Sequence, residues 1–202
     1  MITSTGLVKA AGAAAAVAGA IFVAVQINHP PMDVATVATT EWVIRSAAKS
    51  VMSALALAGI TGMYLRQRRE VGVLGLAGYL VFAAGYLTMF AVEVIAATVL
   101  PALTDTNPGY VADVLAAAAG GTPEGDIGAL SPFLSLSGVG YMLGGLLFGV
   151  ALFRARVLAR WASLLLAAGT VATASLAVLP EAFNRPMAVP VGVALVGLGV
   201  SL

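Results

Sequence analysis

Six long apolar runs constrain this chain more than any other feature of its sequence. Five of them reach or exceed the roughly 20 residues that an α-helix needs to cross a bilayer, and the last is somewhat shorter. The runs cover residues 7–27, 42–65, 71–100, 130–153, 157–179 and 187–202. In lipid, only helices and closed barrels satisfy the backbone polar groups, and these runs are too long and too continuous for barrel strands, which alternate. The sequence therefore predicts an all-α membrane protein, a compact bundle of six transmembrane helices.

Composition agrees with lipid rather than water around the protein. Of 202 residues, 9% are charged and 60% are apolar, and the mean hydropathy is +1.01, whereas a soluble domain needs more polar surface. No linker or repeat divides the chain, so we expect one domain over residues 1–202. The absence of cysteine and the single histidine exclude thiolate catalysis and a multi-histidine metal site within one chain. We expect no metal, no cofactor and no nucleic-acid partner.

The first and last runs each leave an alternative open. Lys9 followed by small residues could belong to a signal peptide, although we expect an uncleaved helix. The last run is short and ends on Leu202 without a polar flank. Either the natural chain continues or this helix thins the bilayer, and we favour a continuing chain.

Basic residues give the expected orientation. With the N-terminus inside, seven of the ten Lys and Arg residues fall on the cytoplasmic side and three fall outside, which is the bias expected for cytoplasmic loops. The seven are Lys9, Arg66, Arg68, Arg69, Arg154, Arg156 and Arg160, and the three are Arg45, Lys49 and Arg185. We therefore expect a multi-pass protein of the cell membrane with both termini in the cytoplasm.

The longest connection, residues 101–131, contains its own helical pattern. Capping chemistry at residues 104–108 precedes Tyr110, Val111, Val114 and Leu115, which are apolar at helical spacing, and glycines follow at 120 and 121. This pattern predicts a short amphipathic helix on the outer surface. An outer lid is the alternative.

Small residues on the fourth run predict close helix packing. Gly140 and Gly144, then Gly145 and Gly149, repeat at a spacing of four, which lets helix backbones approach closely in lipid. Such a face could also serve a homo-oligomer. The partners that we expect are membrane lipids, a hydrophobic small molecule, and a homo-oligomer or larger membrane complex.

The turn between the fourth and fifth runs carries one resemblance. Its sequence from Leu152 through Arg154-Ala155-Arg156 and Arg160-Trp161 to Gly169 resembles the corresponding turn in a family of six-helix bacterial membrane proteins of unknown function. That family tends to have proline where Ala159 stands and glycine where Ser163 stands. The resemblance covers under a tenth of the chain and implies a fold but no activity.

Charged residues inside two apolar runs form the candidate site. Glu41, Arg45 and Lys49 are spaced by four, within about 80° of one helical face. Glu93 lies roughly 12 Å beyond the midpoint of its run toward the outer face, and Lys49 lies about 7 Å on the outer side of its own midpoint. A tight inner turn makes the two runs an antiparallel hairpin, so we expect these charges to share a depth. Ionisable residues at such depth are costly and usually face the bundle interior.

Other polar residues could extend this site. Tyr86 and Tyr79 precede Glu93 by seven and fourteen residues and so share its helical stripe. The outer ends of the first run and of the loop between the last two runs lie at the same level. We therefore expect a ligand-binding set that comprises Lys49, Arg45, Tyr86, Glu93, His29, Gln26 and Arg185.

Three interpretations of the site follow. The favoured one is a non-enzymatic protein that binds a lipid-like or amphipathic ligand in an outer-leaflet polar pocket, or serves as a transport or accessory subunit. The second is an intramembrane enzyme of isoprenoid cyclase or isomerase type, with Glu93 as the general acid and Tyr86 as a stabiliser of positive charge. The third is a Lys49–Glu93 ion pair that only locks the helices together. The size of any cavity at Glu93 and its contact with Lys49 discriminate among them.

Overall fold

The computed structural model describes residues 3–174 and 186–202, and the regular elements within them are all helical. In chain order they are α1 (Ser4–Ala24), α2 (Val34–Val37), α3 (Thr40–Arg66), α4 (Arg68–Thr98), α5 (Leu100–Leu103), α6 (Pro108–Ala118), α7 (Leu130–Ala155), α8 (Arg160–Ala172), the 3-10 turn η3 (Pro186–Ala188) and α9 (Val189–Ser201). The predicted all-α class is confirmed.

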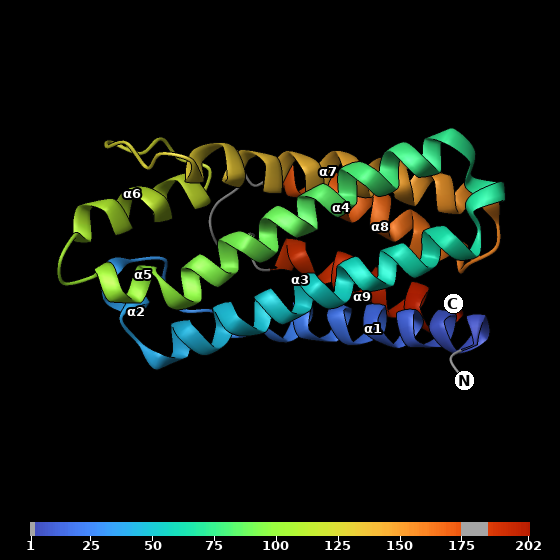
Figure 1. Cartoon of the computed structure of the whole chain (residues 1–202), viewed down its shortest axis with the longest axis horizontal. Helices are drawn as coiled ribbons and strands as arrows, with labels where there is room; N and C mark the ends of the chain where they lie inside the picture. The colour runs from blue at the N-terminus through green and yellow to red at the C-terminus, as the bar shows by residue number, and fades with distance from the viewer. Residues whose placement is uncertain (1–2, 175–185) are drawn as a thin grey trace.

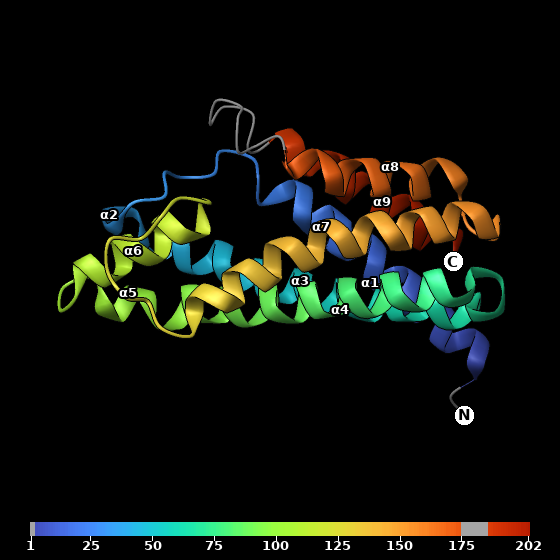
Figure 2. The same cartoon turned by 90° about the horizontal axis from the view of Figure 1, so that it is seen from above.

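Six of these helices form a closed ring. Helices α1, α3, α4, α7, α8 and α9 pack against one another in chain order, and α9 returns to pack against α1. They run lengthwise along the molecule (Figures 1 and 2). The core between them contains the buried aromatic side chains of Phe82, Tyr86, Tyr141 and Phe148. Phe22 of α1 meets Tyr141 of α7 at 6.4 Å between ring centroids, which joins opposite sides of the ring.

Four described helices are long and apolar enough to cross a membrane, namely α1, α3, α4 and α7. They correspond to the first four predicted runs. The last predicted run, which is short in the sequence, corresponds to η3 and α9, which together form one shorter apolar helix over Pro186–Ser201. In the fifth run, α8 extends from Arg160 to Ala172. The end of the fifth run, residues 175–179, lies outside the described residues.

Glycines allow the helices to approach closely. On α7, Gly140 and Gly144 face α4, where a Cβ atom on Gly140 would lie 3.0 Å from the Cα of Gly85. Gly145 and Gly149 face α8 instead, and a Cβ atom on Gly149 would lie 2.8 Å from the backbone nitrogen of Ala167. The predicted small-residue faces are therefore occupied within the chain, on two different sides of one helix.

The α3–α4 turn includes a position whose backbone conformation only glycine adopts easily. Gly72 has φ 58° and ψ −154° inside the first turns of α4, so the helix is interrupted there. This region of the backbone is essentially restricted to glycine. The turn returns α4 antiparallel to α3, so the N-terminal half of α3, with Lys49, lies beside the C-terminal half of α4, with Glu93.

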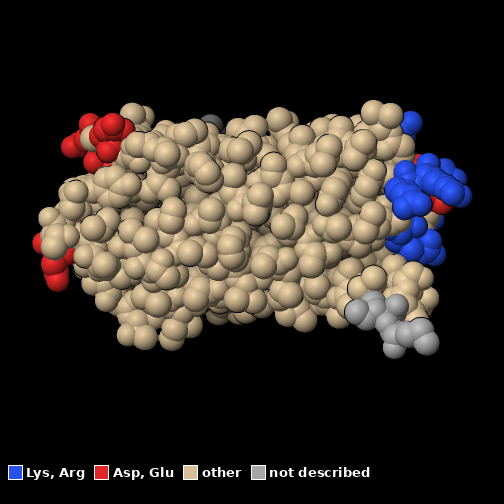
Figure 3. All heavy atoms as spheres, viewed as in Figure 1, with Lys and Arg blue, Asp and Glu red and all other residues tan. Residues whose placement is uncertain are grey.

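On the face shown in Figure 3, charged side chains gather at the two ends of the molecule, with uncharged residues between them. One end carries the Lys and Arg residues of the α3–α4 and α7–α8 turns, and both chain termini lie there (Figure 1). Acidic residues mark the opposite end. This distribution is compatible with insertion of the apolar belt into a membrane.

The acidic end is covered by α2, α5 and α6. The helix predicted within residues 101–131 is present as α6, and its apolar face, with Val111, Val114 and Leu115, is buried against Val37, Trp42 and Leu100. Gly120 closes the helix with φ 84°, and the Gly121 N–H donates to the Ala116 carbonyl, which is a Schellman cap. The apolar face of α6 therefore packs on the bundle.

Candidate functional site

The α3–α4 hairpin brings Lys49 and Glu93 together, as the shared depth predicted. The Lys49 Nζ atom lies 3.6 Å from the Glu93 Oε1 atom, and the two side chains are 17% and 18% exposed. That separation is an ion-pair contact but exceeds the distance of a hydrogen bond. The pair is therefore loose and mostly shielded from solvent.

Trp42 forms the next part of the site, seven residues before Lys49 on the same face of α3. Thr39 caps the helix by accepting from the Trp42 N–H at 3.2 Å, which fixes the residue in the first turn. Its indole N–H donates to the Ala96 carbonyl of α4 at 2.9 Å. The ring lies 6.0 Å from the Lys49 Nζ atom, at the limit of a cation–π contact.

A cavity of about 60 Å³ adjoins the pair. It has room for a few water molecules or a head group of a few heavy atoms, and it is well below the roughly 300 Å³ at which pockets for whole small molecules begin. Its walls come from α3, α4, α5, α6, α7 and the loop before α2, and apart from the pair they are apolar. The lining residues are Met32, Trp42, Lys49, Val92, Glu93, Ile95, Ala96, Leu100, Val114, Leu115, Ala118, Leu130 and Leu134.

Arg45 serves a different purpose from Lys49, although both were expected in one site. It pairs with Glu41 at 2.8 Å. Its guanidinium also donates to the carbonyls of Val25, Ile27 and Asn28 at 3.0 to 3.1 Å, which terminates α1. Arg45 therefore holds the α1 exit against α3, and its donors are used within the protein.

Tyr86 lies in the core and does not line the cavity. It is 1% exposed, with its ring 4.8 Å from Phe82 and 6.0 Å from Tyr141, as measured between centroids. Among the described residues, neither tyrosine hydroxyl has a hydrogen-bond partner. Seven residues of helix correspond to about 10.5 Å, so Tyr86 shares the stripe of Glu93 but not its depth.

The remaining expected residues lie near the end of α1 or outside the described residues. The imidazole of His29 contacts the Pro30 carbonyl through Nδ1 at 2.7 Å, and its ring meets Trp42 edge-on at 6.5 Å between centroids. Gln26 follows Val25, the C-cap of α1, and its backbone N–H donates to the Val23 carbonyl. Arg185 lies in the segment that is not described. Over residues 3–174 and 186–202, no three His, Asp or Glu side chains come together as a metal site would need.

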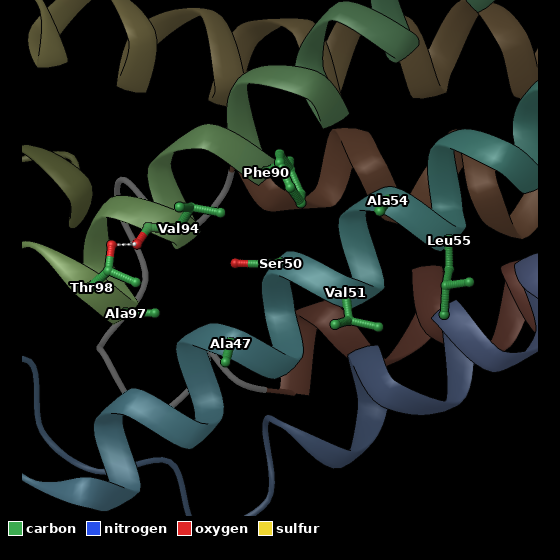
Figure 4. A pocket seen from close by; sticks show the side chains of 9 residues that line it. All are labelled: Ala47, Ser50, Val51, Ala54, Leu55, Phe90, Val94, Ala97 and Thr98. Atoms are coloured by element: carbon green, nitrogen blue, oxygen red, sulfur yellow. Dashed lines mark hydrogen bonds between the residues drawn. The ribbon is translucent and has the colours of Figure 1, made fainter.

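A larger hollow lies on the other side of the hairpin. This groove between α3 and α4 has a volume of about 410 Å³ and is lined by apolar or small side chains (Figure 4). Its two hydroxyl-bearing residues both donate to backbone carbonyls, Ser50 to Ser46 and Thr98 to Val94. The hydroxyl groups that line the groove are therefore already hydrogen-bonded. The face of α3 that lines the groove is about 160° around the helix from Lys49.

The sequence did not predict the far wall of the cavity. Leu130 and Leu134 follow a long connection, and Met32 precedes α2, so nothing in their spacing relates them to Lys49 or Glu93. The apolar stripe of α6 was the available signal, because a buried face on a connecting helix must cover something.

Comparison with known proteins gives no relative. No protein-family model, no curated protein and no solved structure matches the chain at the threshold of significance. The resemblance of the α7–α8 turn to a six-helix family therefore stays a prediction.

Proposed function

We propose that this chain is a non-enzymatic multi-pass protein of the cell membrane that binds an amphipathic, lipid-like ligand, alone or as an accessory subunit of a transport complex. The ligand's head group occupies the cavity beside Lys49 and Glu93, and its hydrocarbon chain follows the apolar side chains that line it. Six helices cross or enter the bilayer, with both termini on the cytoplasmic side.

The charge distribution supports this orientation. The basic end carries the two short turns and both termini, which matches the excess of Lys and Arg in cytoplasmic loops. The acidic end, with α2, α5 and α6, is then outside. Lys49 and Glu93 belong to the outer halves of α3 and α4, so the cavity opens toward the outer leaflet.

The observation that carries the proposal is the loose Lys49–Glu93 pair beside an open space. An ion pair selected only to lock two helices gains most when it is short, hydrogen-bonded and fully satisfied. Here the charged atoms are 3.6 Å apart and adjoin about 60 Å³ of cavity with apolar walls. Charged groups beside apolar walls are the arrangement that an amphipathic head group and the start of its chain require.

The same geometry weighs against the enzyme alternative. A general acid must hold a proton near a substrate, whereas Glu93 is in contact with an ammonium group. A cavity of about 60 Å³ cannot enclose an isoprenoid chain for cyclisation. Tyr86, the expected stabiliser of positive charge, is in the core and away from this cavity.

Native mass spectrometry of the protein purified from membranes tests the proposal. We expect the wild type to retain a lipid-like ligand and the double variant Lys49→Met/Glu93→Leu to lose it. Apolar replacement of a buried pair is often neutral for stability, so the double variant should fold. The matched control is Arg69→Gln/Glu70→Gln, which removes one cation and one acid at the exposed turn of the basic end.

The control should retain the same ligand as the wild type. Two results would contradict the proposal: the same ligand on Lys49→Met/Glu93→Leu in equal amount, or a wild-type protein that carries none from native membranes.

A further inference from the structure

We infer that α6 and the loop after it, residues 108–127, form a lid over the cavity beside Lys49, and that this lid opens to admit and release the head group of the ligand. This inference rests on the proposed function and concerns access to the same site. It follows from the position of α6, from its attachment to the bundle, and from the backbone at the two ends of the lid.

The lid forms one wall of the cavity. Helix α6 lies at the acidic end of the molecule, beside α2 and α5 (Figures 1 and 2). Val114, Leu115 and Ala118 of α6 line the cavity, and Lys49 and Trp42 of α3 line it as well. Displacement of α6 therefore removes three lining side chains at once and exposes the cavity at the acidic end.

Apolar contacts attach α6 to the bundle. Its apolar face, which includes the fully buried Val111, packs in one cluster with Val37 of α2, Trp42 of α3 and Leu100 of α5. In the described part of the chain, no hydrogen bond or ion pair joins α6 to another helix. Apolar contacts are not directional, so they break and form again without leaving a buried polar group unpaired.

The loop after α6 is bonded to α6 itself. The Asp113 carboxylate accepts the backbone N–H of Glu124 at 2.8 Å, and the Tyr110 hydroxyl donates to the Ile127 carbonyl at 3.5 Å. Gly125 packs against the same carboxylate, since a Cβ atom on it would lie 2.7 Å from the Asp113 Oδ2 atom. These contacts keep the loop with the helix, so the two move as one unit.

The hydrogen bonding changes at both ends of the lid. At its C-terminal end, the Gly128 N–H donates to the Asp126 side chain at 2.7 Å, whereas the Gly128 carbonyl accepts from Ser131 of α7 at 3.2 Å. Gly128 has φ 59° and open space around it, because a Cβ atom there would meet nothing within 4 Å. At the N-terminal end, the turn of residues 104–107 separates α5 from α6. A few such positions are enough to absorb the backbone rotation of a hinge.

Thiol labelling tests whether the lid opens, because the chain has no cysteine of its own. Ala96→Cys introduces one thiol on α4, in the cavity wall and in the cluster that α6 covers. The reagent is a water-soluble methanethiosulfonate, added to the full delipidated chain in nanodiscs. In this background, Val111→Ala weakens the docking of the lid without changing the cavity, which Val111 does not line. The matched control is Val191→Ala, the same change at an equally buried position of α9.

Val111→Ala removes two methyl groups from the closed lid but none from the open one. We therefore expect it to speed labelling of the introduced thiol about tenfold, and Val191→Ala to change the labelling rate by less than about twofold. Unchanged labelling in Val111→Ala would overturn the lid. Equal acceleration by Val191→Ala would also overturn it, because the thiol would then report general loosening of the bundle.

Release of the ligand separates failure of the lid from failure of the proposed function. Native mass spectrometry follows the bound ligand after the protein from native membranes is transferred into ligand-free micelles. We expect Val111→Ala to lose the ligand about ten times faster than the wild type, and Val191→Ala to lose it at about the wild-type rate.

If Val111→Ala speeds labelling but leaves release unchanged, the ligand is not held beneath α6 and the proposed function fails. If Val111→Ala changes neither rate, while Lys49→Met/Glu93→Leu still abolishes retention of the ligand, the lid is wrong and the ligand site stands.

Discussion

Two ion pairs begin on the same face of α3, one turn apart, and they are built differently. Arg45 and Glu41 are 2.8 Å apart, and the Arg45 guanidinium also donates to three carbonyls at the end of α1. Lys49 and Glu93 are 3.6 Å apart beside a cavity, and no hydrogen bond from the Lys49 ammonium is present among the described residues. The sequence places three of the four charges on one face of a helix and Glu93 at the same depth on the next helix. The structure divides the four into a clamp, Arg45–Glu41, and an open pair, Lys49–Glu93.

The difference follows from the chemistry of the two cations. Guanidinium is a planar group with five donors, which suits several fixed acceptors at once, and Arg45 meets the backbone where α1 ends. Ammonium is a compact charge on a flexible stem, which can turn toward different partners. A lysine beside a cavity is therefore better suited than an arginine to a ligand that binds reversibly.

The largest expected effect is on the clamp. Arg45→Met removes the ion pair and all three bonds to the α1 exit, so we expect the free energy of unfolding to fall by about 3 kcal/mol. Chemical unfolding in detergent micelles, followed by circular dichroism, measures this. Lys49→Met is the matched control and should cost less than half as much. Equal losses in the two variants would remove the distinction between clamp and open pair.

A smaller effect is expected when one member of the open pair is neutralised. Glu93→Gln leaves Lys49 mostly buried without its counter-charge, which should cost about 1 to 2 kcal/mol. Lys49→Met/Glu93→Leu should recover most of that loss, because neither charge then remains buried. A double variant less stable than Glu93→Gln would indicate that the pair itself holds the hairpin together.

Glu41→Gln should have little effect on stability. The Glu41 side chain is 56% exposed, and an exposed pair at a spacing of four contributes about 0.3 kcal/mol. The carbonyl contacts of Arg45 do not depend on Glu41. A loss as large as that of Arg45→Met would show that the acid, and not the backbone, positions the guanidinium.

Lys49→Arg separates binding from stability. The longer planar group can reach the Glu93 carboxylate directly and fills part of the cavity. We therefore expect the free energy of unfolding to change by less than about 0.5 kcal/mol, while the amount of retained ligand falls. Native mass spectrometry and thermal unfolding of one preparation provide both readings. Full ligand retention by this variant would show that the cavity is not the head-group site.

The sequence predicts the positions of the helices and the depth of the charged residues better than it predicts which groups those residues contact. The positions of α1, α3, α4 and α7 follow from run length alone, because lipid permits little else. The Lys49–Glu93 contact follows from the rise per residue in an antiparallel hairpin. Both predictions use only distances along a helix.

Contacts that depend on loops were beyond such reasoning. Arg45 caps α1 because Asn28 takes a left-handed backbone conformation with φ 50°, which turns the chain back toward α3. The α6 cover, with Leu115 in the cavity wall, depends on how a long connection folds back over the bundle. The placement of Tyr86 in the ligand-binding set was wrong for a different reason. Tyr86 and Glu93 share one face of α4, but two helical turns separate them, so they do not share a site.

Thermal unfolding of the delipidated protein with added lipid extract is the most direct test of the central claim, that the Lys49–Glu93 cavity is a ligand site. A ligand that binds only the folded state adds stability as its concentration exceeds Kd, by about 2.7 kcal/mol at one hundred times Kd. We predict that extract from the native membrane raises the Tm of the wild type and of Arg69→Gln/Glu70→Gln, but not that of Lys49→Met/Glu93→Leu. An equal rise in all three proteins, or no rise in the wild type, would contradict the claim.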